Sequence, residues 1–127
     1  MAKAALVGLD IECGAEILDI LDRVGLNINV ALWAVLPEYE EWRLVIASRQ
    51  LDRPDIENRY ALVIDPLYAA GLSPERIPSI VILRMADRTI KDLRRIFGKT
   101  KSVEGMRLGG QMFGDRFVDE AYVYRIS

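Results

Sequence analysis

Residues 30–48 constrain the fold most, because two apolar runs rich in β-forming residues flank a short polar break that opens with Pro37. This pattern predicts a β-hairpin with a loop over 37–40. The loop length places Val35 opposite Trp42. Both faces of the hairpin are apolar, so it is not stable alone in water and other elements must cover it. One face carries Ala31, Trp33, Val35, Trp42, Leu44 and Ile46, and the other carries Val30, Leu32, Ala34, Val45 and Ala47.

Amphipathic patterns on both sides of this hairpin predict two helices. The first is expected over 11–24, with Asp10 as its N-cap and Gly25 at its C-terminal end. The second is expected over 54–70, and Pro66 should kink or end it. These two helices are the first candidates to cover the hairpin.

The rest of the chain continues this alternation of helices and strands. A β-branched run at 79–85 predicts a third strand, and a capped amphipathic segment predicts a short helix over 88–97. The segments 106–112 and 117–126 predict a second hairpin that turns through the Gly-Asp pair between them. A Gly-Gly pair at 109–110 interrupts its first strand and indicates a bulge.

The predicted order is therefore α-ββ-α-β-α-ββ within a single domain over 1–127. This order predicts the α+β class: a two-layer sandwich with one mainly antiparallel, five-stranded sheet and helices packed on it. Helices on one side alone would expose the second apolar face of the first hairpin. We therefore expect a homo-oligomer or a protein partner that covers this face.

Composition excludes several kinds of chemistry. The chain has no histidine, which removes histidine acid–base catalysis and most zinc sites. Its single cysteine, Cys13, cannot form an internal disulfide, so a cytoplasmic location is expected, and no apolar run is long enough to span a membrane. Lys99 follows a glycine as in a phosphate-binding loop, but Leu93 stands where that motif requires glycine. We expect no cofactor, no metal and no catalytic residue; a metal-dependent hydrolase or nuclease that uses acidic residues is the alternative.

A basic cluster is the main candidate for a binding surface. Residues 73–127 hold 11 Lys and Arg against 7 Asp and Glu, and many of the cations fall on and around the predicted helix over 88–97. A solvated helix face and a phosphate-binding surface both explain such a stripe. No helix-turn-helix, zinc-finger or RNA-recognition motif accompanies it. The candidate residues are Arg84, Arg88, Lys91, Arg94, Arg95, Lys99 and Lys101.

Glu120 is a second candidate. Strict alternation places it on the more apolar face of the last strand, together with Tyr122 and Tyr124. A carboxylate on an apolar face must pair, reach the sheet edge or shift its pKa. The expected explanation is an ion pair with an arginine such as Arg43 or Arg107, and the alternative is a polar site made of Glu120, Tyr122 and Tyr124.

Parts of the sequence resemble a pattern in small, uncharacterised bacterial proteins. The resemblance covers 31–33, 37–38, 41–48 and 119–125, where the chain reads ALW, PE, EWRLVIAS and DEAYVYR. It implies a bacterial cytoplasmic protein and carries over no activity or site residue. The function expected from the sequence is a non-catalytic interaction or accessory domain that contacts nucleic acid through its basic helix.

Overall fold

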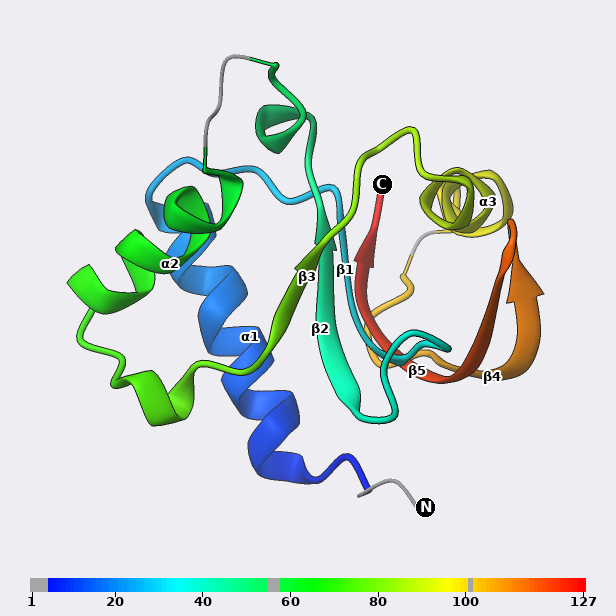
Figure 1. Ribbon diagram of the computed structural model, residues 1–127, viewed down its shortest axis with the longest axis horizontal. Helices are drawn as coiled ribbons and strands as arrows, with labels where there is room; N and C mark the ends of the chain where they lie inside the picture. The colour runs from blue at the N-terminus through cyan, green and yellow to red at the C-terminus, as the bar shows by residue number, and fades with distance from the viewer. Residues whose placement is uncertain (1–4, 55–57, 101) are drawn as a thin grey trace.

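The computed structural model describes residues 5–54, 58–100 and 102–127, which form one five-stranded sheet with helices on both of its faces (Figure 1). The strand order is β3-β2-β1-β5-β4, so β1 lies at the centre and is buried along its whole length. β3 runs parallel to β2, and the other neighbouring strands are antiparallel. The strands are β1 (Val30–Val35), β2 (Trp42–Ala47), β3 (Ile80–Ile82), β4 (Arg107–Phe113) and β5 (Arg116–Ile126).

Three α-helices cover the described sheet from two sides. α1 (Gly8–Arg23) and α2 (Arg59–Ala69) pack on one face, and α3 (Arg88–Phe97) packs on the other (Figure 1). Two 3₁₀ turns, η1 (Arg49–Leu51) and η2 (Pro74–Arg76), lie in the connections. The predicted α+β class, the order of the elements and the mainly antiparallel sheet are confirmed. The helices form two outer layers, whereas the two-layer prediction placed them in one.

The first hairpin follows its predicted register. Val35 lies opposite Trp42, and Trp33 lies opposite Leu44. Its two predicted faces are the centres of two separate hydrophobic cores, one beneath α1 and α2 and one beneath α3. Alternation along a strand and the short loop were therefore sufficient to predict this part of the fold.

The second face of the hairpin is covered within the chain. Val30, Leu32 and Ala34 on this face are at most 3% exposed. They belong to the same core as Ile90 of α3 and Phe113 of β4, because the β4–β5 hairpin curls over them together with α3 (Figure 1). This face needs no partner, and the argument for a partner from its exposure is wrong.

The starts of α1 and α2 differ from the prediction. α1 begins at Gly8, so Asp10 lies in its first turn, where its carboxylate accepts a hydrogen bond from the Val7 N–H at 3.1 Å. α2 begins at Arg59, and the Asn58 side chain caps it. Residues 55–57 of the predicted helix lie outside the described residues. α2 also continues through Pro66 to Ala69, although Pro66 has no N–H to donate to the Leu62 carbonyl.

β5 breaks the predicted alternation of its side chains in two places. The pairing with β1 shifts between Ala31 and Leu32, which leaves Tyr124 as an extra residue in β5. A second change of face lies opposite Gly110, which has a φ of +62°. Gly110 has no partner in the β4–β5 ladder, but the register is the same on both sides of it, so neither strand gains a residue and the predicted bulge at 109–110 is instead a corner. The buried residues of β5 are Val118, Ala121, Val123 and Ile126.

No helix among the described residues is both long and apolar enough to cross a membrane.

Candidate nucleic-acid interface

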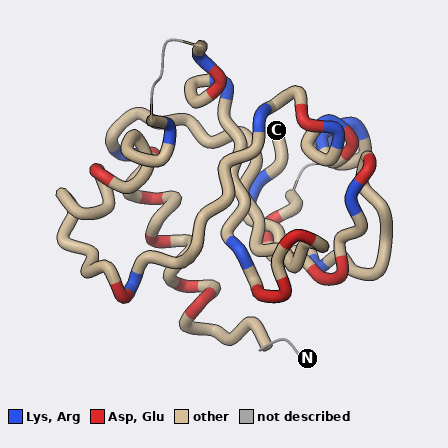
Figure 2. The backbone as a smooth tube through the Cα atoms, in the orientation of Figure 1, with Lys and Arg blue, Asp and Glu red and all other residues tan. Residues whose placement is uncertain are grey.

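α3 has the ends and the inner face that its sequence predicts. The Asp87 carboxylate accepts a hydrogen bond from the Thr89 N–H at 2.9 Å and so caps the helix. Ile90 and Leu93 are buried against the sheet. The opposite face of α3 is turned to solvent, and Figure 2 shows lysine and arginine positions gathered along this helix.

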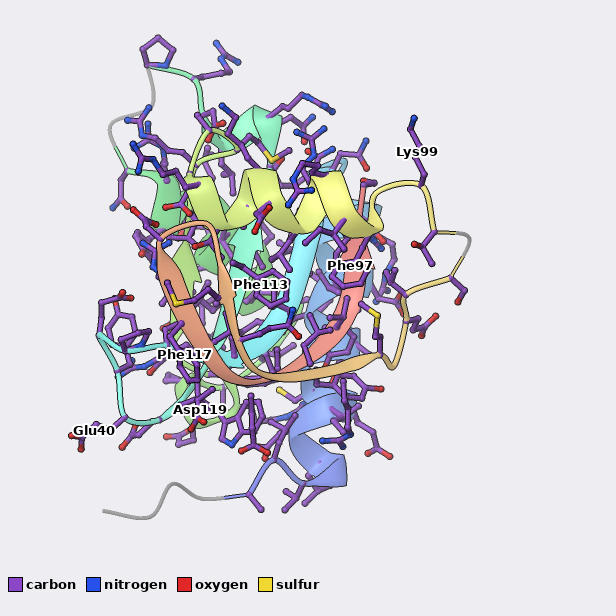
Figure 3. The ribbon with its side chains drawn as sticks, turned by 90° about the vertical axis from the view of Figure 1, so that its right-hand side faces the viewer. Glu40, Phe97, Lys99, Phe113, Phe117 and Asp119 are labelled. Atoms are coloured by element: carbon purple, nitrogen blue, oxygen red, sulfur yellow. The ribbon has the colours of Figure 1, made fainter. Side chains whose placement is uncertain are left out.

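The predicted basic residues are not equivalent. Arg84, Arg88, Lys91, Arg95 and Lys99 are exposed. Lys99 follows the helix and points away from the body of the protein (Figure 3).

One of the predicted basic residues does not share that solvent-facing surface. Arg94 is half-buried, and its Nε donates a hydrogen bond to the Ser127 carbonyl at 2.8 Å. Lys101 lies outside the described residues. The basic surface on the described part of the chain therefore consists of the exposed cations alone.

The turn between β4 and β5 lies against the solvent face of α3. Between the two elements lies a shallow hollow of about 460 Å³ that is open to solvent. The Asp92 carboxylate joins them, because it accepts hydrogen bonds from the Gly114 N–H at 2.9 Å and from the Arg95 guanidinium at 3.1 Å. These two contacts hold the pKa of Asp92 below its ordinary value, the Gly114 N–H more strongly than Arg95. The hollow is lined by Arg88, Lys91, Asp92, Arg95, Gly114 and Asp115.

The ion pair with Asp92 distinguishes Arg95 from the other exposed basic residues of α3. Much of the charge of Arg95 is neutralised by a carboxylate at its side. The side chains of Arg88 and Lys91 form no ion pair with any residue of the described ranges. The free positive charge beside the hollow therefore belongs mainly to these two residues.

Arg116 fixes the start of α3 to the rest of the sheet. Its Nη1 donates to the Asp87 carboxylate at 2.8 Å and to Thr89 Oγ1 at 3.1 Å, and its Nε donates to Glu38 at 3.2 Å. Burial lowers the pKa of Arg116, but Asp87 and Glu38 together raise it above its ordinary value. Arg116 stays charged, and it holds α3, β5 and the tip of the first hairpin together.

Gly114 is required where the turn approaches α3. Its φ is +61°, and a Cβ at this position would lie 2.5 Å from the carbonyl carbon of Arg88. Only glycine allows both the backbone conformation and this close approach. The sequence predicted a turn here, but it gave no signal that the turn would lie on α3.

The second predicted site is arranged differently. Glu120 is exposed. It lies opposite Val35, and Tyr122 lies opposite Trp33, so Glu120 and Tyr122 share one face of β5 and the carboxylate reaches solvent there. The rings of Tyr122 and Tyr124 pack edge to face with centroids 5.4 Å apart. Arg107, one of the two predicted partners of Glu120, lies over the Tyr122 ring at 5.3 Å from its centroid.

Tyr124 holds α1 on the sheet. Its hydroxyl accepts a hydrogen bond from Trp33 Nε1 at 2.8 Å and donates one to the Ile11 carbonyl of α1 at 2.6 Å. Burial is the main cause that raises the pKa of Tyr124 to about 12. This tyrosine is therefore a neutral structural contact at neutral pH.

Other groups that could carry chemistry are few. Burial raises the pKa of the Cys13 thiol, which lies 3.0 Å from the Arg76 carbonyl oxygen, so the thiol form is favoured. Within the described ranges, no three or more Asp, Glu and Cys side chains gather closely enough to hold a metal ion.

The solvent face of α3 therefore combines two cations that form no ion pair among the described residues, a hollow and a turn that is hydrogen-bonded to the helix. Comparisons of the chain with models of protein families, with curated proteins and with solved structures gave no match.

Proposed function

We propose that this chain is a non-catalytic interaction domain that binds the phosphate backbone of nucleic acid through the solvent face of α3. The observation that carries the proposal is the positive charge of Arg88 and Lys91, which form no ion pair with a carboxylate of the described residues. Phosphate groups are the common biological ligands for such a surface, and their binding releases counterions. Lys99 lies beyond the end of the helix and extends the same charge.

The position of these cations in the helix supports a function other than folding. Arg88 is the first residue of α3 and Lys91 lies in its first turn, where the helix macrodipole favours negative charge. The two residues are also like charges three positions apart, which destabilises a helix by about 0.2–0.5 kcal/mol. A face that served only to keep the helix in solvent would be more stable with other polar residues.

The proposed binding does not depend on the stacking of bases. Aromatic rings on which bases stack are absent from the solvent face of α3 in the described part of the chain: the exposed rings are Tyr60 and Tyr68 on α2 and Phe117 on β5. We therefore expect similar affinity for different sequences, with a strong dependence on salt.

A salt series with two matched double variants tests the proposal. Arg88→Ala/Lys91→Ala removes the cations beside the hollow, and Arg23→Ala/Arg76→Ala removes two exposed arginines that lie with α1 and η2. Binding of labelled DNA and RNA, single- and double-stranded, is measured by fluorescence anisotropy. The first variant should lower the slope of log K against log salt by about 1.8, from about 0.9 for each lost phosphate contact. The second variant has the same net charge and should keep the wild-type slope.

Arg95→Ala gives a further comparison. Since Arg95 is already paired with Asp92, its loss should weaken binding less than the loss of Lys91. Equal losses in both double variants would instead show that binding follows net charge alone. Absence of binding at low salt would refute the proposal.

A cytoplasmic location and association with a protein partner or a second copy belong to the same proposal. The single cysteine and the resemblance of 41–48 and 119–125 to bacterial proteins support the location.

A further inference from the structure

α2 turns a largely apolar side to solvent. In Figure 1 this helix forms one margin of the molecule, on the other side of the sheet from α3. Val63 and Leu67 are fully buried on its inner side. With about 3.6 residues per turn, Asp65 points directly away from these two side chains. The residues on either side of Asp65 on this outer face are Ala61, Leu62, Tyr68 and Ala69.

This composition differs from that of an ordinary surface helix, whose outer face is polar. Leu62 is 44% exposed and Tyr68 is 49% exposed. α2 has only two charged residues, Arg59 and Asp65, and Arg59 is half-buried with its Nε donating to the Leu51 carbonyl. Figure 2 shows the contrast with α3, along which charged positions are frequent. Large apolar side chains that gather on an exposed face indicate an interaction site.

A groove adjoins this face of α2. It lies between α2 and the C-terminal end of α1, has a volume of about 510 Å³ and is open to solvent. Leu62 and Pro66 line it on the side of α2, and Val24 and Leu26 line it on the side of α1. An apolar groove beside a helix is a common site for the apolar side chains of an amphipathic partner helix.

The outer face of α2 is held in place by contacts at the start of the helix. The Asn58 side chain accepts a hydrogen bond from the Ala61 N–H at 3.1 Å. The Tyr60 hydroxyl accepts one from the Ile82 N–H of β3 at 3.3 Å. The surface is therefore formed before a partner binds, which lowers the entropy lost on association.

Asp65 indicates the charge of the partner. Its carboxylate forms no ion pair with any described residue. It lies in the middle of α2, where the helix macrodipole favours neither sign of charge. A second copy packed on the same face about a two-fold axis would bring two Asp65 carboxylates close together, and like charges repel. A lysine or arginine of a different protein would complement this carboxylate.

We propose that the outer face of α2 and the adjoining groove bind an amphipathic helix of a partner protein. Apolar side chains of this helix fill the groove, and a lysine or arginine beside them pairs with Asp65. A membrane surface fits less well, because interfacial helices carry lysine and arginine around their apolar face and Asp65 would be repelled by anionic lipids. The inference does not depend on the proposed binding of nucleic acid, since α3 lies on the opposite side of the sheet (Figure 1).

A model peptide tests this inference with the whole protein. The probe is a capped, alanine-based helical peptide of about 18 residues, because shorter helices are marginal in water. It carries leucines at positions i, i+3 and i+7 and one lysine beside them. In a titration followed by two-dimensional NMR, the amide signals of Leu62, Asp65 and Ala69 should shift and saturate. A peptide with serine in place of leucine should bind about tenfold more weakly, and one with glutamate in place of lysine about threefold more weakly.

Exchange of the charges separates a direct pair with Asp65 from general attraction. Asp65→Lys should reverse the preference, so that the glutamate peptide binds more tightly than the lysine peptide. Glu40→Lys makes the same change of charge at the exposed tip of the first hairpin (Figure 3) and should leave the preference of the wild type. Leu62→Ser should weaken binding of both peptides by about tenfold. Because Leu62 is partly exposed, this variant should keep the far-UV circular dichroism of the wild type.

Four results would overturn the inference. They are no saturable shift along α2, equal binding of the lysine and glutamate peptides, a preference that Asp65→Lys leaves unchanged, or a dimer that shifts the same amide signals without peptide. The last of these would identify a second copy as the occupant. Wild-type binding of the lysine peptide by Arg88→Ala/Lys91→Ala would support a site that is separate from α3.

Discussion

Replacing Tyr124 with phenylalanine tests how α1 is held on the sheet. The hydroxyl of this residue connects Trp33 of β1 with the Ile11 carbonyl of α1. The replacement leaves the Trp33 indole N–H without its acceptor, and an unsatisfied, partly buried donor costs about 1–3 kcal/mol. The Tyr124→Phe protein should therefore be less stable than the wild type by this amount near neutral pH.

The difference in stability between the wild type and Tyr124→Phe should shrink at alkaline pH. The pKa of Tyr124 is raised to about 12, against about 10 for an ordinary tyrosine. A raised pKa means that the folded state favours the protonated hydroxyl, so this stabilisation is complete below about pH 10 and is lost as the pH rises to about 12. Two pKa units correspond to about 2.7 kcal/mol, and since Tyr124 is only half-buried we expect about 1–2 kcal/mol.

Urea unfolding between about pH 8 and about pH 12, followed by far-UV circular dichroism, measures this loss. The wild type should lose about 1–2 kcal/mol more than Tyr124→Phe over this range. Tyr68→Phe is the control, because Tyr68 is 49% exposed on α2 and its replacement should leave the pH profile unchanged. Wild-type and Tyr124→Phe profiles that stay parallel would refute the reasoning about the hydroxyl.

Four further substitutions test the close contacts and the charges. In Gly14→Ala, the new Cβ would overlap the Tyr124 hydroxyl, so the free energy of unfolding should fall by about 1–3 kcal/mol, and less in a Tyr124→Phe background, as a double-mutant cycle in urea would reveal. Gly114→Ala should cost about 1–3 kcal/mol in the same assay through its positive φ and the approach to α3; a neutral result would contradict the placement of the turn. Asp92→Asn should lower stability at neutral pH, and this difference should shrink in acid, because a lowered pKa contributes stability that protonation removes; it should also strengthen nucleic-acid binding by freeing an arginine. Lys91→Glu should raise the stability of α3 by about 0.5–1 kcal/mol while it weakens binding to nucleic acid, and a variant that loses both would indicate a structural lysine.

The parts of the fold that the sequence predicts correctly are those set by neighbouring residues. The register of the first hairpin follows from alternation and from a short loop, and both its faces are assigned correctly. The bounds of α3 are correct as well, since Asp87 and the apolar spacing of Ile90 and Leu93 specify them locally. In each case the information lies within a few residues of the element that it determines.

The errors come from contacts between distant parts of the chain. The extra residue Tyr124 is accommodated because its hydroxyl reaches α1, about a hundred residues earlier in the sequence. The corner opposite Gly110 places Val118 in the core beneath α3, whereas Tyr122 packs in the core beneath α1 and α2. Alternation within β5 alone contains no sign of either irregularity, so this change of face could not be predicted from the sequence. The role of Asp92 was missed for a similar reason, because its hydrogen-bond partner Gly114 belongs to a turn that is distant in the sequence.

The charges of α3 now separate into those that serve the fold and those that do not. Arg94 is half-buried and bonded to the Ser127 carbonyl, and Arg95 pairs with the carboxylate that holds the β4–β5 turn. Both also lie in the last turn of the helix, where the macrodipole favours cations. Arg88 and Lys91 have neither reason, since they lie at the unfavourable end without an ion pair in the described structure. A cation that costs stability and still faces solvent beside a hollow is better explained by a ligand than by the helix, and this is why these two residues carry the proposal.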